Sequence, residues 1–513
     1  MKRNFLSSSA IVLALAVSGC ATEPPHALKP TYVPSNFTAP ISPDAALWPQ
    51  ADWWKGFNSD ELNGLIDTAQ KNNLDLSTAM GAVLQAEGNA EIAGAPLFPQ
   101  IGLGSGATRS RSGGGTGNTY NLSLNGSFIL DIWGEARDNL RAADEAVKSS
   151  RYAQEEVALT VTAGVGTTYL DVLALRERVT IAQANIAAAK RILSITQAKV
   201  TNGVSSRLDL AQQEAQVDTQ EASIPPVLEQ EREARYALAI LLGELPEGFD
   251  VQAKNLDSVV GPAVRPGLPS ELLRRRPDVA EAEANLASAH ASVDAARAAF
   301  FPQIGLSASG GYASASVGSL VKNSNLAWSI GASLLQTIFD GGTLEGGLHV
   351  SKAQQIQLVA TYRKTVLTAF SDVETSLGQV ASLTEQERLE TNAANAASEA
   401  FKISEIQYRE GVTDLLTVLT AQQTLFTAQD QLVQIKLARL QADVNLYKAL
   451  GGGWTEADED ATQPIPQTNT PVTPSSMPGP GAQPASSIPT TPGPTSVPNE
   501  PAVTPTPGRR PHG

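Results

Sequence analysis

The sequence has few of the residues that build disulfides, large cores or nucleic-acid surfaces. Its 513 residues include one cysteine, Cys20, so no intrachain disulfide can form. Aromatic residues make up 5% of the chain, a composition that suits long helices better than a large globular core. Acidic residues outnumber basic ones by 52 to 37, which gives a net charge of −15. We therefore expect no nucleic-acid partner, because phosphate binding needs clustered lysine and arginine.

Long apolar runs and catalytic motifs are also missing. Beyond the N-terminal segment no run reaches about eighteen consecutive apolar residues, so the sequence predicts no transmembrane helix, and any membrane crossing must use strands. The chain has four histidines at scattered positions, without the spacing of metal ligands, and no Gly-x-Ser-x-Gly motif. We expect no catalytic residue, no metal site and no enzymatic activity.

The N-terminus has the pattern of a lipoprotein signal. Two basic residues precede an apolar run from Ala10 to Val17, and Ser18-Gly19-Cys20 follows. This run is too short to span a membrane and is typical of a secretion signal. Small residues before a cysteine match the bacterial lipobox, which predicts a signal peptide over 1–19. Cys20 would then carry a diacylglycerol and an N-acyl lipid, with no other cofactor, and residues 20–58 would form a lipid anchor and proline-rich segment. Ala21, in place of aspartate, favours sorting to the outer membrane.

The rest of the chain is a tandem duplication. Residues 97–103 (LFPQIGL) return as 300–306 (FFPQIGL), 202–205 (NGVS) as 410–413 (EGVT), and 241–243 (LLG) as 449–451 (ALG). These offsets predict a first repeat over 59–250 and a second over 269–454, joined by a linker over 251–268. Each repeat is expected to contain a helix, two strands, a very long helix, a glycine turn and a further helix.

The expected strands, at about 100–110, 119–130, 303–314 and 325–336, alternate in polarity. Leu122, Leu124 and Phe128 would point one way, whereas Ser123 and its alternate neighbours would point the other. Such alternation is typical of a transmembrane barrel with lipid on one side and a lumen on the other, and also of a sandwich hairpin with one buried face. The chain has only two such hairpins, too few for a sandwich. The glycines at 113–117 predict a flexible surface loop between the first two strands.

Four strands cannot close a barrel, because the smallest membrane barrels have about eight. Two chains would supply eight strands and leave an interior filled by side chains, whereas three would supply twelve and leave a water-filled passage. The expected fold class is therefore a membrane β-barrel of twelve strands, completed in a homotrimer and joined to a long α-helical coiled-coil barrel.

Two very long helices would supply the helical barrel. Glu135 to about Val200 contains no strong helix breaker, and its valines and Tyr169 recur at steps of three and four. In the second repeat an apolar seam follows steps of three, four and seven, at Ile356, Val359, Val366, Phe370, Val373, Leu377 and Val380. About 65 residues at 1.5 Å each would extend about 100 Å, the scale of the periplasm. A structural coiled coil without a conduit would show the same pattern.

Each long helix is followed by a glycine turn, 203–206 in the first repeat and 411–414 in the second. Glycine supplies the left-handed conformation that ends a helix, and Ser205, Ser206, Thr413 or Asp414 would cap the next helix. Charged residues and a tyrosine lie around the turns and would tie neighbouring hairpins together in a threefold ring: Arg207, Asp209, Tyr408, Arg409 and Asp414.

Prolines mark two further features. Pro225 and Pro226 lie within the helix after the first turn, and they predict a break or kink because neither nitrogen can donate a hydrogen bond. Residues 455–513 are rich in proline, serine and threonine and predict a disordered tail.

Several motifs, in this order, resemble the TolC-like outer-membrane efflux proteins, specifically their lipidated OprM and NodT branch. They are WWKGF at 53–57, NNLDL at 72–76, RRRPDVAE at 274–281, the two Phe-Pro-Gln-Ile motifs, and YREGV at 408–412. The resemblance covers about residues 45 to 454. It implies a trimeric duct lipid-anchored in the outer membrane, with a helical tunnel in the periplasm. There the duct would dock a periplasmic membrane-fusion adaptor and, through it, an inner-membrane RND-type transporter.

The resemblance also implies roles for the two turns. The adaptor would dock at Gly203, Val204, Ser205, Gly411, Val412 and Thr413. The periplasmic gate would be formed by Asp209, Tyr408, Arg409 and Asp414. The implied function is passive conduction of drugs or other small molecules to the exterior. A duct for protein or polysaccharide secretion, or a non-conducting structural lipoprotein of the envelope, are the alternatives.

Overall fold

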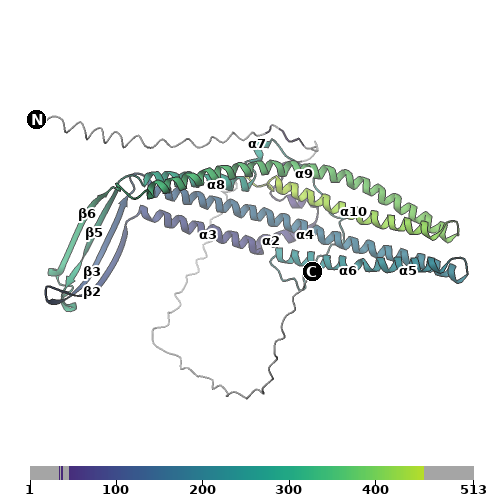
Figure 1. Ribbon diagram of the computed structural model, residues 1–513, viewed down its shortest axis with the longest axis horizontal. Helices are drawn as coiled ribbons and strands as arrows, with labels where there is room; N and C mark the ends of the chain where they lie inside the picture. Colours follow the sequence, from purple (N-terminus) through teal and green to yellow (C-terminus); the bar gives the residue numbers. More distant parts are fainter. Residues whose placement is uncertain (1–33, 35, 39–45, 456–513) are drawn as a thin grey trace, which may run out of the picture. The chain divides into compact units, whose positions relative to one another are not determined.

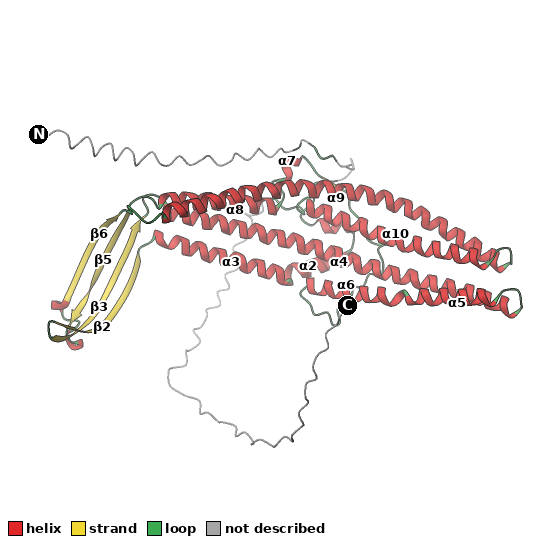
Figure 2. Cartoon of the chain, in the orientation of Figure 1, coloured by secondary structure: helices red, strands yellow, loops and turns green. Residues whose placement is uncertain are grey.

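The computed structural model describes residues 34, 36–38 and 46–455, so Cys20 and the proline-rich tail lie outside the described residues. The described part is mainly helical and carries two copies of one unit (Figures 1 and 2). The first copy contains helices α2 (Asp60–Asn72), α3 (Leu74–Gly94), α4 (Glu135–Thr201), α5 (Arg207–Ala222) and α6 (Ile224–Leu241). The second contains α7 (Pro269–Leu272), α8 (Pro277–Ala298), α9 (Thr343–Arg409) and α10 (Leu415–Ala449).

The strands form one four-stranded sheet in the order β2-β3-β5-β6 with all neighbours antiparallel. Their bounds are β2 Gln100–Ser112, β3 Gly115–Leu130, β5 Gln303–Ser314 and β6 Leu326–Leu335. The loop predicted at 113–117 is wrong in extent. Gly113 and Gly114 alone make the turn, with φ of +59° and +87°, and β3 already begins at Gly115. Two glycines with positive φ form the tight hairpin turn whose twist matches the strands.

In both repeats an aspartate between the strand pair and the long helix caps the start of that helix. Asp131 follows β3 and its carboxylate accepts hydrogen bonds from the backbone of Ala136 and Arg137. Asp340 follows β6 and accepts from the backbone of Gly342 and Leu344. Because the first turn of a helix has free N–H groups, these carboxylates satisfy donors that would otherwise be unpaired. Both long helices thus begin at equivalent points of the two repeats.

The long helices pack along the predicted seams. Both α4 and α9 have 67 residues, which corresponds to about 100 Å. Val161, Val165 and Tyr169 of α4 are buried, as are Val366 and Val373 of α9. Ile356, at the start of the predicted seam, is 50% exposed in the single chain. The sheet lies at one end of α4 and α9, and the turns after these helices lie at the other (Figure 1).

The core extends into two segments that the sequence assigned to an anchor and a linker. Strand β1 (Ala46–Leu47) pairs with β4 (Val264–Arg265), and η1 (Trp53–Phe57) follows β1. Trp53 stacks on Tyr447 of α10 with ring centroids 5.0 Å apart. Between the repeats, Val251, Leu256 and Val259 are buried in the same cluster. Both segments therefore hold the repeats together at mid-length.

The predicted proline break is confirmed. Helix α5 ends at Ala222 and α6 begins at Ile224, with Pro225 and Pro226 in its first turn, where a missing N–H costs nothing. One stretch of α4 is long and apolar enough to cross a membrane by length and composition, and 56% of that stretch is buried inside the chain. Helix α4 as a whole packs against α3, α6, α8 and α10.

Candidate functional site: a two-faced sheet and two hairpin tips

One face of the sheet is apolar across all four strands. The register places Leu103, Leu124, Gly310 and Trp328 in one row, and Gly126, Ala308 and Ile330 in the row next to it. The other large members of this apolar face are Ile101, Tyr120, Leu122, Phe128, Leu130, Ile304, Leu306, Tyr312, Leu326, Ala332 and Leu334. Trp328 and Ile330 are 74% and 79% exposed. No other element of the described part of the chain covers this face, as expected for a lipid-facing surface.

The opposite face carries small, uncharged side chains except near the helices, where Ile129 and Leu335 lie on it. Glycine, serine, threonine and asparagine dominate it: Gly102, Gly104, Gly106, Thr108, Ser110, Thr119, Asn121, Ser123, Asn125, Ser127, Gly305, Ser307, Ser309, Gly311, Ser329, Gly331 and Ser333. The Ser309 and Ser329 hydroxyls lie 2.9 Å apart across β5 and β6. This polar face is suited to line a wet passage that exerts little charge selection.

Helix caps account for two of the four predicted gate residues. At the first tip, between α4 and α5, Ser206 caps α5 and its hydroxyl accepts from the Asp209 backbone, while Asp209 accepts from the Ser205 hydroxyl and the Ser206 backbone. The Ser205 hydrogen bond, followed by that of the Ser206 backbone, lowers the pKa of the Asp209 carboxyl. At the second tip, Asp414 caps α10 and accepts from both the hydroxyl and the backbone of Thr417, which lowers its pKa. Both carboxylates therefore remain anionic.

Tyr408, a third predicted gate residue, lies between the two hairpins of one chain. Its side chain is 3% exposed, and its hydroxyl is 2.9 Å from the Thr196 hydroxyl on α4. The Lys199 ammonium donates to the Tyr408 carbonyl and lies 4.3 Å from the centre of the ring. Thr196 and Lys199 were not predicted, because neither stands out in an α4 sequence rich in small and polar residues. Together the three side chains join α4 to α9 near the tips.

The remaining predicted site residues lie at the tips, and most of them are exposed. Arg409 pairs with its neighbour Glu410 at 3.1 Å, with both side chains largely exposed. Gly203 and Gly411 have φ of +71° and +79°, as the glycine turns predicted. Val204 is 73% exposed and Val412 is 75% exposed. Ser205 and Thr413 are half-buried beside them.

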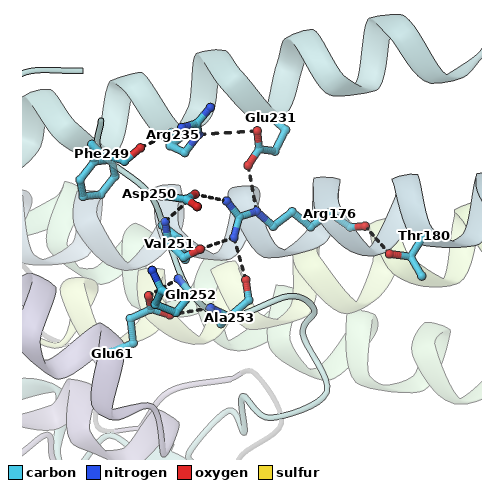
Figure 3. Close-up of polar contacts among 10 residues, drawn as sticks. All are labelled: Glu61, Arg176, Thr180, Glu231, Arg235, Phe249, Asp250, Val251, Gln252 and Ala253. Atoms are coloured by element: carbon cyan, nitrogen blue, oxygen red, sulfur yellow. Dashed lines mark hydrogen bonds and ion pairs between the residues drawn. The ribbon is translucent and has the colours of Figure 1, made fainter. Parts of the chain in front are cut away.

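A second polar cluster lies away from the tips, at the inter-repeat segment (Figure 3). Arg176 of α4 pairs with Glu231 of α6 at 2.8 Å and with Asp250. Its guanidinium also donates to the backbone carbonyls of Val251 and Ala253. These contacts fix the segment after α6 against α4. Among the described residues, no three His, Cys, Asp or Glu side chains form a group that could hold a metal ion.

Comparison with known proteins agrees with the resemblance. The family model described as "Outer membrane efflux protein" matches residues 65–244 and 268–452. A pyoverdine export outer membrane protein of Pseudomonas aeruginosa, OpmQ, is 41% identical over 415 residues, covering 78% of this chain and 87% of that protein. A toluene efflux pump outer membrane protein of Pseudomonas putida, TtgC, is 32% identical over 493 residues, covering 90% and 98%.

Solved structures share the fold. The outer-membrane channel OprN superposes with a TM-score of 0.76 at 26% identity, covering 83% of this chain and 99% of that one. Such channels are trimers with a helical barrel and a β-domain, and they are passive conduits without catalytic activity. The efflux function predicted from the sequence is thus confirmed, rather than secretion of protein or polysaccharide or a non-conducting structural role. This chain belongs to the outer membrane efflux protein family, the TolC-like outer-membrane channels of tripartite efflux pumps.

Proposed function

We propose that this channel is the exit duct of a pump with a periplasmic membrane-fusion adaptor and an inner-membrane RND-type transporter, and that the adaptor docks on the two tips. The observation that carries this proposal is the matched pair of exposed apolar side chains, Val204 and Val412, each directly after a turn glycine. Leu208 and Leu416 are also exposed, four residues farther along. Exposed apolar residues at equivalent points of both repeats suit a partner that meets both hairpins in the same way.

Site-specific crosslinking tests this docking. Cys20 is the only cysteine, so V204C and V412C each add one new thiol that a photoactivatable maleimide can label in cells. We expect each variant to crosslink a periplasmic adaptor, with the transporter recovered alongside it. Q354C, an exposed position toward the sheet end of α9, is the matched control. Equal adaptor recovery from all three positions would contradict docking at the tips.

The gate at rest is proposed to involve Asp209, Tyr408, Arg409 and Asp414. Support comes from Tyr408, whose contacts with Thr196 and Lys199 hold the two hairpins of a chain together, and from Asp414, which fixes the start of α10. Loss of either contact would free a hairpin to move outward. D414A and Y408F are therefore expected to raise the conductance of the purified trimer in a planar bilayer. Unchanged conductance of either variant would remove that residue from the gate.

A lipid on Cys20 is proposed as the membrane anchor. The support is the lipobox sequence ahead of this lone cysteine. Mass spectrometry of the mature N-terminal peptide should show an acylated cysteine, and C20A should abolish the added mass. An unmodified Cys20 in protein recovered from the outer membrane would contradict the proposal.

The cargo is proposed to be small organic molecules selected by the transporter. The polar face of the sheet is built from uncharged residues, and relatives with the same family fold are named for pyoverdine and for toluene, two chemically unlike compounds. Because pyoverdine is a siderophore and its exporter has the higher identity of these two relatives, siderophores are the first class to test. A deletion strain should retain siderophore in the periplasm and regain export when complemented. Normal export, together with sensitivity to toxic solvents or antibiotics, would place the channel in drug efflux instead.

A further inference from the structure

The sheet carries an unusual distribution of charge. Its two hairpins, residues 100–130 and 303–335, contain no aspartate or glutamate, although the chain has 52 of them. Their charged residues are Arg109, Arg111 and Lys322, all basic. Arg109 and Arg111 precede the β2–β3 turn, and Lys322 lies between η3 (Val317–Ser319) and η4 (Asn323–Asn325) in the β5–β6 connection. All three therefore lie at the end of the sheet away from the helices (Figure 1).

The register decides which face the arginines occupy. Arg109 pairs with Asn118 and Arg111 with Thr116, two and four residues beyond the pair of Ala107 and Tyr120. Because alternate residues of a strand share a face, both arginines continue the apolar face of the sheet. Thr108 and Ser110 occupy the polar face between them. The arginines thus point to the lipid side of the barrel rather than into its passage.

The arginines also begin where the apolar band ends. From Leu130 to Tyr120, β3 covers about 34 Å at 3.4 Å per residue, which a tilt of about 40° reduces to about 26 Å. The apolar band of an outer-membrane barrel is about 25 Å tall and is bordered by aromatic girdles. Tyr120 lies at the distal edge of this band, and Tyr312 lies opposite Leu122 in the next row. Arg109 and Arg111 follow the band, at the level of lipid headgroups.

These side chains have no acidic partner in the part of the chain that the structure describes. Both arginines and Lys322 are exposed, and none of them is in an ion pair among the described residues. A guanidinium presents parallel N–H donors that match two oxygens of a phosphate. Lipid phosphate supplies the complementary charge at this height.

We propose that Arg109, Arg111 and Lys322, here called the cationic rim, bind the phosphate groups of outer-leaflet lipids and hold the barrel at a fixed height. The proposal rests on the outer-membrane barrel of this family and is independent of adaptor docking and of the gate. Attraction of anionic cargo to the exit is the competing role. The polar face opposes that role, because Thr108 and Ser110 carry no charge toward the passage.

Binding of a defined lipid tests the proposal. The full-length trimer in phosphatidylethanolamine nanodiscs is titrated with fluorescent lipid A that carries two phosphates, and with the same lipid after phosphate removal. We expect preference for the phosphorylated lipid, and a loss of about thirtyfold in affinity in R109Q/R111Q, since each basic residue at an anionic lipid surface contributes about fivefold. Inorganic phosphate at millimolar concentration should not compete, because it lacks the acyl chains.

Two control variants separate position from net charge. R232Q/R388Q removes two exposed arginines from helices and should bind lipid A like the wild type. T108R/R109T/S110R/R111S keeps the composition but moves both guanidinium groups to the polar face, and it should lose the lipid preference. Wild-type lipid binding by this variant or by R109Q/R111Q would overturn the proposal. Anion selectivity of the wild type that R109Q/R111Q loses, with lipid A binding unchanged, would assign the rim to cargo.

Discussion

Asp443 of α10 is a buried carboxylate, and burial raises its pKa more than its ion pair lowers it. It is 6% exposed, and Arg439 donates to it at 3.1 Å. Arg439 also pairs with Glu387, so its charge is shared between two carboxylates. Burial raises the pKa of the Asp443 carboxyl to about 7, against the lowering effect of Arg439. Above that pH the folded chain must hold a desolvated negative charge.

The raised pKa predicts a pH-dependent stability. The unfolded carboxyl ionises near pH 3.8, so the favourable contribution of the protonated folded form is present below that pH and is lost as the pH rises to about 7. D443N stays neutral and avoids this loss. We expect its melting temperature to exceed that of the wild type by at least about 2 °C at pH 8 and to approach it at pH 4. D218N, at an exposed position on α5, should show no such change, and an equal response of both variants would refute the assignment.

Single residues were predictable where their role depends on neighbours in sequence. Gly203, Gly411 and the caps at Ser206 and Asp414 follow from local backbone rules, and the structure confirms them. Tyr408 was predicted from its place beside the second turn as one of the side chains that tie hairpins together, and only its role in the gate came from the resemblance. Its partner Thr196 is 212 residues away, and that contact depends on how α9 is rotated against α4, which no local pattern encodes.

At the scale of elements, the segment between α6 and α7 is buried although its apolar residues follow no regular period. Its buried residues Val251, Leu256 and Val259 follow neither a helical nor a strand period, so the sequence suggested only a linker. Its position depends on backbone hydrogen bonds to side chains of other elements. Glu61 of α2 accepts from the Gln252 and Ala253 backbone, and Arg176 donates to carbonyls of the same stretch (Figure 3).

Arg176 should therefore control whether this segment opens. R176M leaves the largely buried Glu231 without its partner at 2.8 Å and removes the hydrogen bonds to the Val251 and Ala253 carbonyls, a loss of about 3 kcal/mol. We expect limited proteolysis within 244–263 to become at least about tenfold faster, because cleavage follows the population of the open form. R232M removes an arginine of α6 from an exposed pair with Glu229 and should cost under about 1 kcal/mol. Similar cleavage of R176M and the wild type would show that apolar packing alone holds the segment.

At the scale of the molecule, the two faces of the sheet could be predicted from the alternation of polar and apolar residues along each strand. Closure of the sheet into a barrel could be predicted only by adding the strands of neighbouring chains. Alternation along each strand predicted two faces, and the register confirms that most large apolar members of all four strands share one face. β2 and β6 remain open edges in one chain. Such open edges need partner strands, which neighbouring chains supply when a barrel closes in a trimer. Ile356, at the start of the α9 seam, is also exposed in one chain, and the pattern of the seam does not say whether its partner is the same chain or a neighbouring one.

The two faces predict opposite effects of one lysine at adjacent positions. Ile330 lies on the apolar face opposite Ala308, and Ser329 lies on the polar face opposite Ser309. I330K places a charge near the middle of the lipid band, where lysine costs about 2–4 kcal/mol per chain. S329K places the same charge in the wet passage, where it remains solvated. Both substitutions therefore introduce the same side chain and charge at adjacent positions on opposite faces.

We expect I330K to reduce the amount of heat-modifiable trimer that resists urea extraction from the outer membrane, and S329K to leave it near the wild-type amount. Three added lysines in the passage of an S329K trimer should also shift its ion selectivity in a planar bilayer toward anions. Normal assembly of I330K together with failed assembly of S329K would reverse the two faces, and would move Arg109 and Arg111 from the lipid to the passage.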